Sequence, residues 1–433
     1  MQLISIISIN YMTLLDRKIP PTFKTIDNIS FPWPTTVKTD VGIPLFILNQ
    51  GDMPIIKLSL LSEAGSWYEP QNGIAYFAAK MLTEGTLNKT AQEIAAYIDY
   101  YGANLSIITR VDYCSIELVC LSKHFVVMLD LLTELLTTST FPQTQLNLLQ
   151  KLRVQALKVE DEKSSQVAHK RFKEALLGKA HPYGYSLTAA DIAIVTTDHL
   201  ISFYKNQLLA DCQVLLSGQV TEQHIQYVQQ LLSHIPSKPA NRPNYPLSIK
   251  SPSRIHVQKE GSLQSAICIG KLLFPKTHPD YLAMYIVTEL LGGYFGSRLM
   301  RNIREEKGYT YNIHATMLPL KETTYFLIST EAIQEFAEQT CEEIYREIKI
   351  LQTEEVDLEE LTTLKNYMIG NFLTSINDPF SIMQRFKEAH LYGLSQEFYE
   401  DFYHTLQQIT PARIKEIANT YLALESLTEV RVG

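Results

Sequence analysis

The sequence is poor in the features that mark several common protein classes. Its 433 residues include only five cysteines, an odd number without a C-x-x-C pair. Neither a disulfide framework nor a thiol redox site or zinc ribbon is therefore expected. The net charge is −8 and no run of basic residues occurs, which argues against nucleic acid as a partner. We expect the cysteines to be small buried hydrophobes in a reducing compartment.

Long apolar stretches are also absent. No segment approaches the roughly 20 apolar residues that a membrane span requires, so no membrane span is expected. The N-terminal run MQLISIISIN (1–10) has no basic residue before it and no small-residue cleavage site, which argues against a secretory signal. Met12 is an alternative start, because ordinary sequence begins there. We expect a soluble cytoplasmic protein, with the periplasm as the alternative.

What the chain does contain is an internal repeat. The segment YGANLSI (101–107), followed by a strand-like stretch, parallels KGYTYNI (307–313), which is also followed by a strand-like stretch. A second pair, 194–218 and 409–433, repeats at nearly the same offset. Each member of this pair has the pattern of a Thr-capped helix, a break and a strand that ends in glycine. Two features in the same order at nearly one offset indicate a duplication.

The two halves are separated by a proline-rich stretch. Five prolines lie between Pro236 and Pro252, a density that suits neither a helix nor a central strand. Each half mixes strands with long helices in irregular order, which predicts an α+β fold of two tandem homologous domains. Each domain is expected to be a mostly antiparallel sheet with helices packed on it. The predicted divisions are a domain at 1–235, a linker at 236–252 and a second domain at 253–433.

Residues 64–86, AGSWYEPQNGIAYFAAKMLTEGT, predict a helix that begins after Gly73, because apolar residues then recur at helical spacing. This segment resembles the active-site helix of the pitrilysin/insulinase metallopeptidases, which carries the motif H-x-x-E-H. In that family the two histidines bind zinc and the glutamate is the general base. A further glutamate from a later helix is the third zinc ligand.

All four of these positions differ in this chain. Tyr76 and Lys80 stand in place of the two histidines, and Ala79 stands in place of the glutamate. An alignment through the acidic pair 160–161 places Gln155 at the third ligand. A phenol and an ammonium are poor zinc ligands, and alanine cannot relay a proton. No two histidines of the sequence have H-x-x-x-H spacing. The resemblance therefore implies a degenerate zinc site with no metal and no catalytic residue, and zinc only in a partner chain.

The second half keeps a different motif of the same family. Residues 290–311, LLGGYFGSRLMRNIREEKGYTY, resemble the family pattern LGGxxxSRLxxxLRExxGLAY. The resemblance implies that Arg304 and Tyr311 reach a partner's zinc domain, where they hold the bound peptide and the developing oxyanion. Gly292 and Gly293 match a glycine loop near the substrate. The alternative is that Arg304 only pairs with a neighbouring glutamate and Tyr311 is an ordinary strand aromatic.

The resemblance spans residues 37–433 and leaves three functions open. The first is a non-catalytic subunit of a zinc metalloendopeptidase, similar to mitochondrial processing peptidase or bacterial two-chain peptidases. Such a subunit forms a heterodimer with a zinc-bearing homologue, with a homodimer as the alternative. The second is a structural scaffold. The third is a stand-alone protein that binds an extended peptide at an exposed sheet edge. An autonomous metallopeptidase is not expected.

Overall fold

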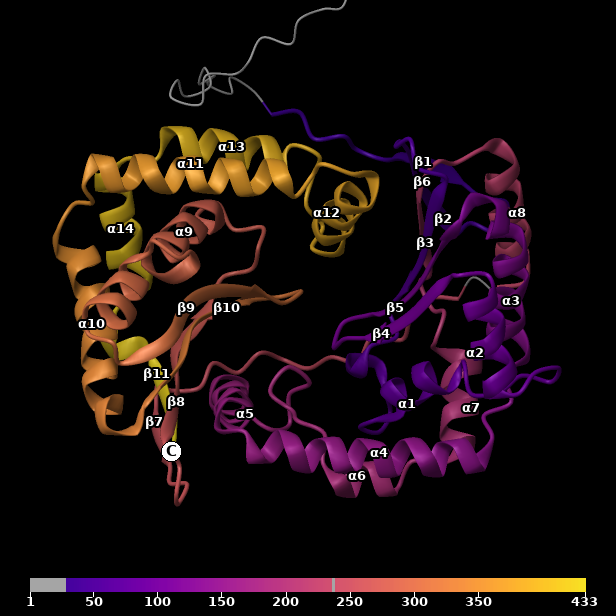
Figure 1. Cartoon of the computed structure of the whole chain (residues 1–433), viewed down its shortest axis with the longest axis horizontal. Coiled ribbons are helices and arrows are strands. Elements are labelled where there is room, and N and C mark those ends of the chain that lie inside the picture. The colour runs from indigo at the N-terminus through magenta and orange to yellow at the C-terminus, as the bar shows by residue number, and fades with distance from the viewer. Residues whose placement is uncertain (1–28, 236–237) are drawn as a thin grey trace, which may run out of the picture.

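The computed structural model describes residues 29–235 and 238–433, which form two halves that face each other, each built on one mixed sheet (Figure 1). The strands of the first sheet are β1 (Thr35–Lys38), β2 (Pro44–Asn49), β3 (Ile55–Ser62), β4 (Asn104–Thr109), β5 (Cys114–Leu121) and β6 (Gln213–Gly218). Those of the second are β7 (Arg254–Val257), β8 (Gln264–Leu273), β9 (Thr310–Pro319), β10 (Thr324–Ile333) and β11 (Thr428–Val432).

Helices make up the rest of each half. The first contains α1 (Ile74–Met81), α2 (Ala91–Tyr100), α3 (Phe125–Thr138), α4 (Gln143–Glu162), α5 (Ser164–Leu177), α6 (Ala189–Ala193), α7 (Thr197–Asn206) and α8 (Glu222–Ser233). The second contains α9 (Tyr281–Thr288), α10 (Ala337–Thr353), α11 (Leu358–Thr374), α12 (Pro379–Leu391), α13 (Phe398–Gln408) and α14 (Pro411–Tyr421). Two π-helical segments, η3 (Glu289–Gly293) and η4 (Met300–Glu306), lie between α9 and β9. Short 3₁₀ turns are η1 (Ser66–Tyr68), η2 (Ser122–His124), η5 (Gln334–Phe336) and η6 (Leu424–Ser426).

The strand order of the two sheets is the same once β1 is set aside. The first runs β1-β2-β6-β3-β5-β4 and the second β7-β11-β8-β10-β9. In each sheet one pair is parallel, β2 with β6 and β7 with β11, and the other pairs are antiparallel. The helices before β6 and β11 both begin at a threonine, Thr196 or Thr410, whose hydroxyl accepts a backbone N–H. The predicted α+β fold of two tandem homologous domains is confirmed.

Two helices cross from one half to the other. Helix α5 packs on the second sheet, where Phe172 is buried in one cluster with Cys268 and Leu327. Helix α12 packs on the first sheet, where the ring of Phe386 lies 4.9 Å from that of Phe46. Figure 1 shows α5 beside the second sheet and α12 beside the first. Each sheet is therefore covered on one face by a helix of the opposite half.

Strand β2 shows why the sheets need cover on both faces. Its residues Leu45 and Ile47 belong to the core of the first half, whereas Phe46 and Leu48 belong to the cluster that α12 shares. Successive side chains of a strand point to opposite faces, so the unbroken apolar run PLFIL fits a strand buried on both sides.

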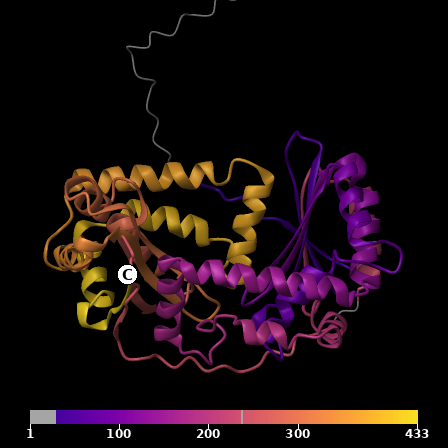
Figure 2. The same ribbon diagram turned by 60° about the horizontal axis from the view of Figure 1, so that its bottom comes forward.

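The described part of the predicted linker, from residue 238, contains no helix or strand before β7. It follows the outside of the molecule from the first half to the second (Figure 2). Trp67 anchors it, since the indole Nε1 donates a hydrogen bond of 3.0 Å to the carbonyl oxygen of Pro243. This hydrogen bond holds the middle of the linker against the first half.

Several predictions from composition can be compared with the described residues. All five cysteines are buried and unpaired, and burial raises the pKa of the Cys114 thiol to about 12, which confirms their role as small hydrophobes. No helix in ranges 29–235 and 238–433 combines the length and apolar character needed to cross a bilayer. The run 1–10 and Met12 lie outside the described residues.

Candidate functional site

Helix α1 carries the segment that resembles the zinc motif. It begins after Gly73, which has a φ of 95°, a conformation open to glycine. The first turn has no cap from Gly73; instead the Oε2 of Glu69 accepts a hydrogen bond of 2.8 Å from the N–H of Ala75. Burial raises the pKa of Glu69 to about 7, against the effect of the backbone N–H groups of Gly73 and Ala75. A carboxyl group that titrates near neutral pH therefore stands at the start of this helix.

A cavity of about 640 Å³ lies between α1, α4 and α5. Tyr76 of α1 lines it, together with Arg153, Leu157 and Glu160 of α4. The three α4 positions are spaced i, i+4 and i+7, which puts them on one face of the helix. The cavity thus occupies the place at which the two motif helices meet.

The structure brings only one of the four expected zinc-site positions into this cavity. Tyr76 lines it, whereas Ala79 is 1% exposed in the core of the first half. Lys80 is exposed and lies near Glu84. Gln155 is exposed on the opposite side of α4, because two residues along a helix turn a side chain through about 200°. The α4 side chain that lies against Tyr76 is Arg153.

The chemistry of this cavity does not suit zinc. The guanidinium carbon of Arg153 lies 5.6 Å from the centre of the Tyr76 ring, and its Nη1 donates to Glu160 at 2.7 Å. A cation therefore occupies the neighbourhood in which a metal would need anionic or neutral nitrogen ligands. In the described part of the chain, no group of three or more His, Cys, Asp or Glu side chains could hold a metal ion.

The second motif forms a cluster of two exposed aromatic rings around a half-buried arginine. The Arg304 guanidinium carbon lies 4.6 Å from the ring centre of Phe295 and 5.8 Å from that of Tyr311. The two rings are 64% and 85% exposed, respectively. Arg304 also lies 3.8 Å from Glu305, a long ion pair that leaves its other N–H groups available. Phe295, Arg304 and Tyr311 are called the Arg–Tyr cluster below.

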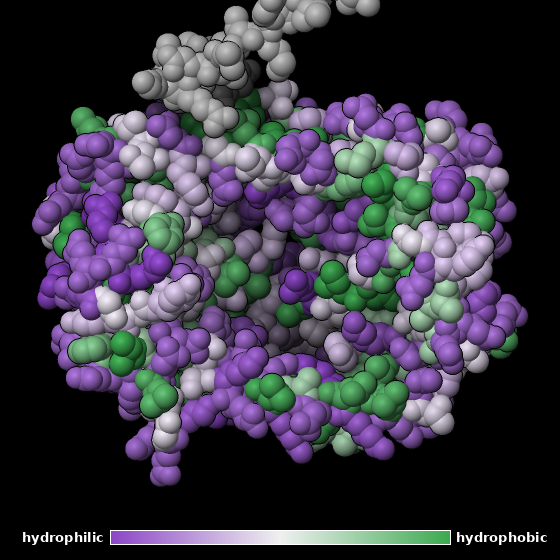
Figure 3. Space-filling view, viewed as in Figure 1, coloured by the Kyte–Doolittle hydropathy of each residue, from purple (hydrophilic) through white to green (hydrophobic). Residues whose placement is uncertain are grey.

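The Arg–Tyr cluster lies at a second cavity, which shares a lining residue with the first. Tyr311 lines a second cavity, of about 360 Å³, together with Ser165 and His169 of α5. His169 lines the first cavity as well. Helix α5 therefore stands between the two motif regions, and the face of the molecule between the halves is hollowed (Figure 3).

The two glycines of the loop have a packing explanation. A Cβ on Gly292 would lie 2.6 Å from the backbone nitrogen of Ala315 on β9. A Cβ on Gly293 would lie 2.4 Å from the carboxyl group of Glu289. Glycine is thus required at Gly292 for the close approach of η3 to β9, independently of any substrate.

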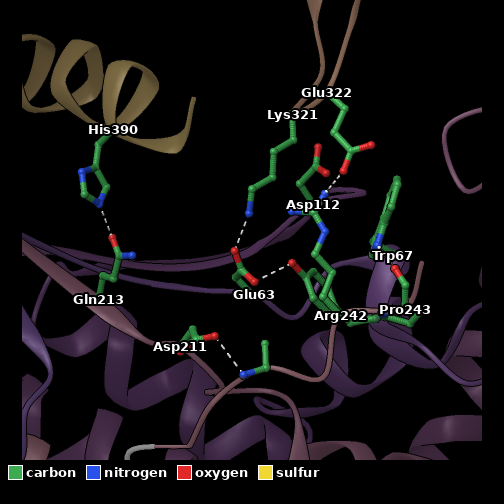
Figure 4. A network of polar contacts seen from close by, with 12 residues as sticks. Glu63, Trp67, Asp112, Asp211, Gln213, Arg242, Pro243, Lys321, Glu322 and His390 are labelled. Carbon is green, nitrogen blue, oxygen red and sulfur yellow. Dashed lines mark hydrogen bonds and ion pairs between the residues drawn. The ribbon is translucent and has the colours of Figure 1, made fainter. Parts of the chain in front are cut away.

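One ion pair joins the two halves, and another joins the linker to the second half (Figure 4). Lys321, in the turn between β9 and β10, pairs with Glu63 at the end of β3. Arg242 of the linker pairs with Glu322 at 2.7 Å. Burial raises the pKa of Glu63, but hydrogen bonds from Lys321 and Tyr68, together with the charge of Lys321, outweigh burial, so the net pKa is lowered. The Lys321–Glu63 pair thus links the end of β3 directly to the β9–β10 turn.

Sequence reasoning missed the basic residues of the first cavity. Lys170 and Lys173 of α5 line it, as does Arg110 at the end of β4. In the sequence these residues have the pattern of a solvated helix face and a turn. Only the i, i+3 spacing of the two lysines signals a shared face.

Two family models match the chain. Residues 48–190 match the model described as Insulinase (Peptidase family M16), and residues 195–368 match the Peptidase M16 inactive domain. With the two-domain fold described above, these matches define the class as an M16-type peptidase fold. The chain belongs to the M16, or insulinase, family, which confirms the resemblance found in its motifs.

Similar proteins are found among bacterial zinc proteases. The chain is 22% identical to the uncharacterized zinc protease YmxG of Bacillus subtilis (strain 168), over 87% of this chain and 93% of that protein. It is also 22% identical to an uncharacterized zinc protease of Rickettsia felis, over 77% of this chain and 81% of that protein. Among solved structures, a peptidase M16 inactive domain from Pseudomonas fluorescens has a TM-score of 0.85 at 23% identity. The match covers 92% of this chain and 98% of that chain. A protease from Helicobacter pylori has a TM-score of 0.83 at 18% identity, covering 93% and 99%.

Proposed function

We propose that this chain is a non-catalytic subunit of a zinc metalloendopeptidase, and that a homologous chain bears the zinc. The carrying observation is a contrast between the two motif regions. The Arg–Tyr cluster has two exposed rings and keeps both donors, whereas at the position that resembles the zinc motif Tyr76 lies against Arg153. Membership of the M16 family supports a peptide substrate.

The cluster suits contact with a peptide carbonyl or an oxyanion. A guanidinium offers several N–H donors in a fixed plane, and a phenol adds one O–H donor. Stacking on Phe295 orients the guanidinium of Arg304, while Tyr311 lies on its other flank. In the proposed assembly these donors stabilise charge that develops at the partner's metal centre, a contribution worth roughly 10²–10³-fold in rate per donor.

The test is to mix the purified chain with the zinc-bearing M16 homologue of the same organism and to follow cleavage of a quenched fluorescent peptide. We expect activity that neither chain shows alone. Arg304→Ala and Tyr311→Phe should each lower kcat of the mixture by roughly 10²–10³-fold without preventing assembly. Arg301→Ala is the matched control, because Arg301 is an exposed arginine of the same π-helical segment.

Two results would count against this function. One is the absence of any gain on mixing, and the other is full activity of a mixture that contains the Arg304→Ala, Tyr311→Phe double variant. Full activity of that double variant in an intact complex would favour the scaffold function instead.

A stand-alone peptide-binding protein is the second candidate, favoured by strand β4. This strand is the last in its sheet, so its outer edge has no neighbouring strand, and Thr109 at its end lines the first cavity. Such an edge can pair with an extended peptide. Micromolar or tighter peptide affinity of the chain by itself, without a gain in cleavage on mixing, would favour this function.

A further inference from the structure

The first cavity has an excess of basic side chains. Five cations line it and only two carboxyl groups do. The cations are Arg110, Arg153, Lys170, Lys173 and Lys179, and the carboxyl groups are Glu69 and Glu160. The side chains that line this cavity therefore carry a net positive charge.

Three of the five cations already have carboxylate partners. Glu160 pairs with Arg153 at 2.7 Å and with Lys170 at 3.4 Å. Lys170 also pairs with Asp161 at 2.8 Å, and Lys179 pairs with a glutamate of α5 at 3.0 Å. These contacts neutralise one side of the cavity. An anionic ligand in this cavity would therefore be recognised by the cations that have no carboxylate partner.

Lys173 and Arg110 have no carboxylate partner among the described residues, 29–235 and 238–433. Lys173 is partly buried on α5, and both burial and the nearby charge of Lys170 lower its pKa. An ammonium in such a position costs stability unless a counter-charge is present. A bound carboxylate would supply that counter-charge.

The shape of the cavity suits an extended peptide. Its volume of about 640 Å³ is within the range of ligand pockets, roughly 300–1,000 Å³. Thr109 and Arg110 place the end of the free edge strand β4 at its wall. A neighbouring hollow of about 530 Å³ shares Leu157, Lys170 and Lys179 with it, which extends the groove along α4. A peptide paired with the edge of β4 would thus enter the cavity that Lys173 lines.

We propose that this cavity binds the acidic segment of an extended peptide, with the peptide carboxylates on Lys173 and Arg110. The inference goes beyond the subunit function, because it assigns a ligand class to a site that the Arg–Tyr cluster does not contain. It concerns the isolated chain, so it stands or falls separately from any activity gained on mixing.

The experiment measures fluorescence anisotropy of labelled Glu-Ala repeat peptides with the lone full-length chain, beside Gln-Ala and Lys-Ala repeats of equal length. We expect the Glu-Ala peptide to bind at least tenfold more tightly than the Gln-Ala peptide, and more weakly as salt is raised. Lys173→Gln should weaken Glu-Ala binding about tenfold, as loss of a charged hydrogen bond predicts. Lys151→Gln, an exposed α4 lysine outside the cavity, is the control.

Thermal unfolding of the free variants separates binding from folding. Because Lys173 has no counter-charge, Lys173→Gln should leave the Tm unchanged or raise it while peptide affinity falls. Equal affinity for the Glu-Ala and Gln-Ala peptides would overturn the proposal. So would undiminished binding by Lys173→Gln, or binding of inorganic phosphate that depends on Lys173 while the acidic peptide does not bind.

Discussion

At the scale of single residues, Glu69 links the candidate site to pH. Its carboxyl group is held in a buried position at the start of α1, and its pKa is raised to about 7 from an ordinary value of 4.5. Between these two values the folded chain keeps a proton that the unfolded chain releases. The free energy of unfolding should therefore fall as the pH rises from 4.5 to 7, by about 3 kcal/mol in total.

Glu69→Gln should remove this slope, because glutamine has no proton to lose and its carbonyl can still accept from the Ala75 N–H. Urea unfolding at a series of pH values from 4.5 to 8 measures the difference between wild type and variant. We expect the variant to gain relative to wild type with rising pH. Parallel curves for the two proteins would show that Glu69 titrates normally.

At the scale of secondary-structure elements, one buried ion pair fastens α12 to the first sheet. The Nζ of Lys387, whose side chain is 7% exposed, lies 2.8 Å from Glu117 and 2.9 Å from the hydroxyl of Ser115 on β5. Burial raises the pKa of Glu117, but hydrogen bonds from Lys387 and Lys57 outweigh it and lower the pKa to about 2. This carboxylate therefore stabilises the fold above pH 4.5, and that contribution is lost as the pH falls toward 2.

Lys387→Met should lower the free energy of unfolding by about 3 kcal/mol, since it leaves Glu117 buried with the more exposed Lys57 as its remaining cationic partner. Denaturant unfolding at pH 7 gives the value. Lys57→Met is the control and should cost about 1 kcal/mol or less, and the double variant Lys387→Met, Glu117→Gln should recover part of the loss. Equal effects of the two lysine variants would contradict a fastening role for Lys387.

At the scale of the whole molecule, the exchanged helices make the two halves depend on each other. Without α5, Cys268 and Leu327 of the second sheet would no longer be covered. Without α12, the first sheet would expose Phe46 and Leu48. The repeated sequence suggests two independent domains. In the structure, however, each half needs a helix of the other half to bury one face of its sheet. We therefore expect one cooperative unfolding transition.

Phe172→Ala tests this coupling, because Phe172 is fully buried between α5 and the second sheet. The substitution should lower the free energy of unfolding by about 3–5 kcal/mol. Calorimetry should show a single transition shifted to lower temperature. Two separate transitions in which only one moves would show that the halves unfold independently.

Much of this architecture could be predicted from the chain itself, because the signals are local or repeated. The duplicated segments and the Thr-capped helices at Thr196 and Thr410 depend on neighbouring residues alone. So does the replacement of the zinc motif by Tyr76, Ala79 and Lys80, since the motif lies within a single helix.

Other features required the three-dimensional structure. Which face of α4 meets α1 depends on helix packing, so only the structure shows Arg153, and not Gln155, beside Tyr76. The basic lining of the cavity brings together side chains from β4, α4 and α5, which no sequence spacing connects. The family and the duplication could be inferred from the chain alone, and the replacement of the zinc ligands stays a prediction from the motif. Tertiary packing decided which half each of α5 and α12 covers, and it decided the charge of the cavity. Both depend on apolar faces and charged side chains that are far apart in the chain and meet only in the folded molecule.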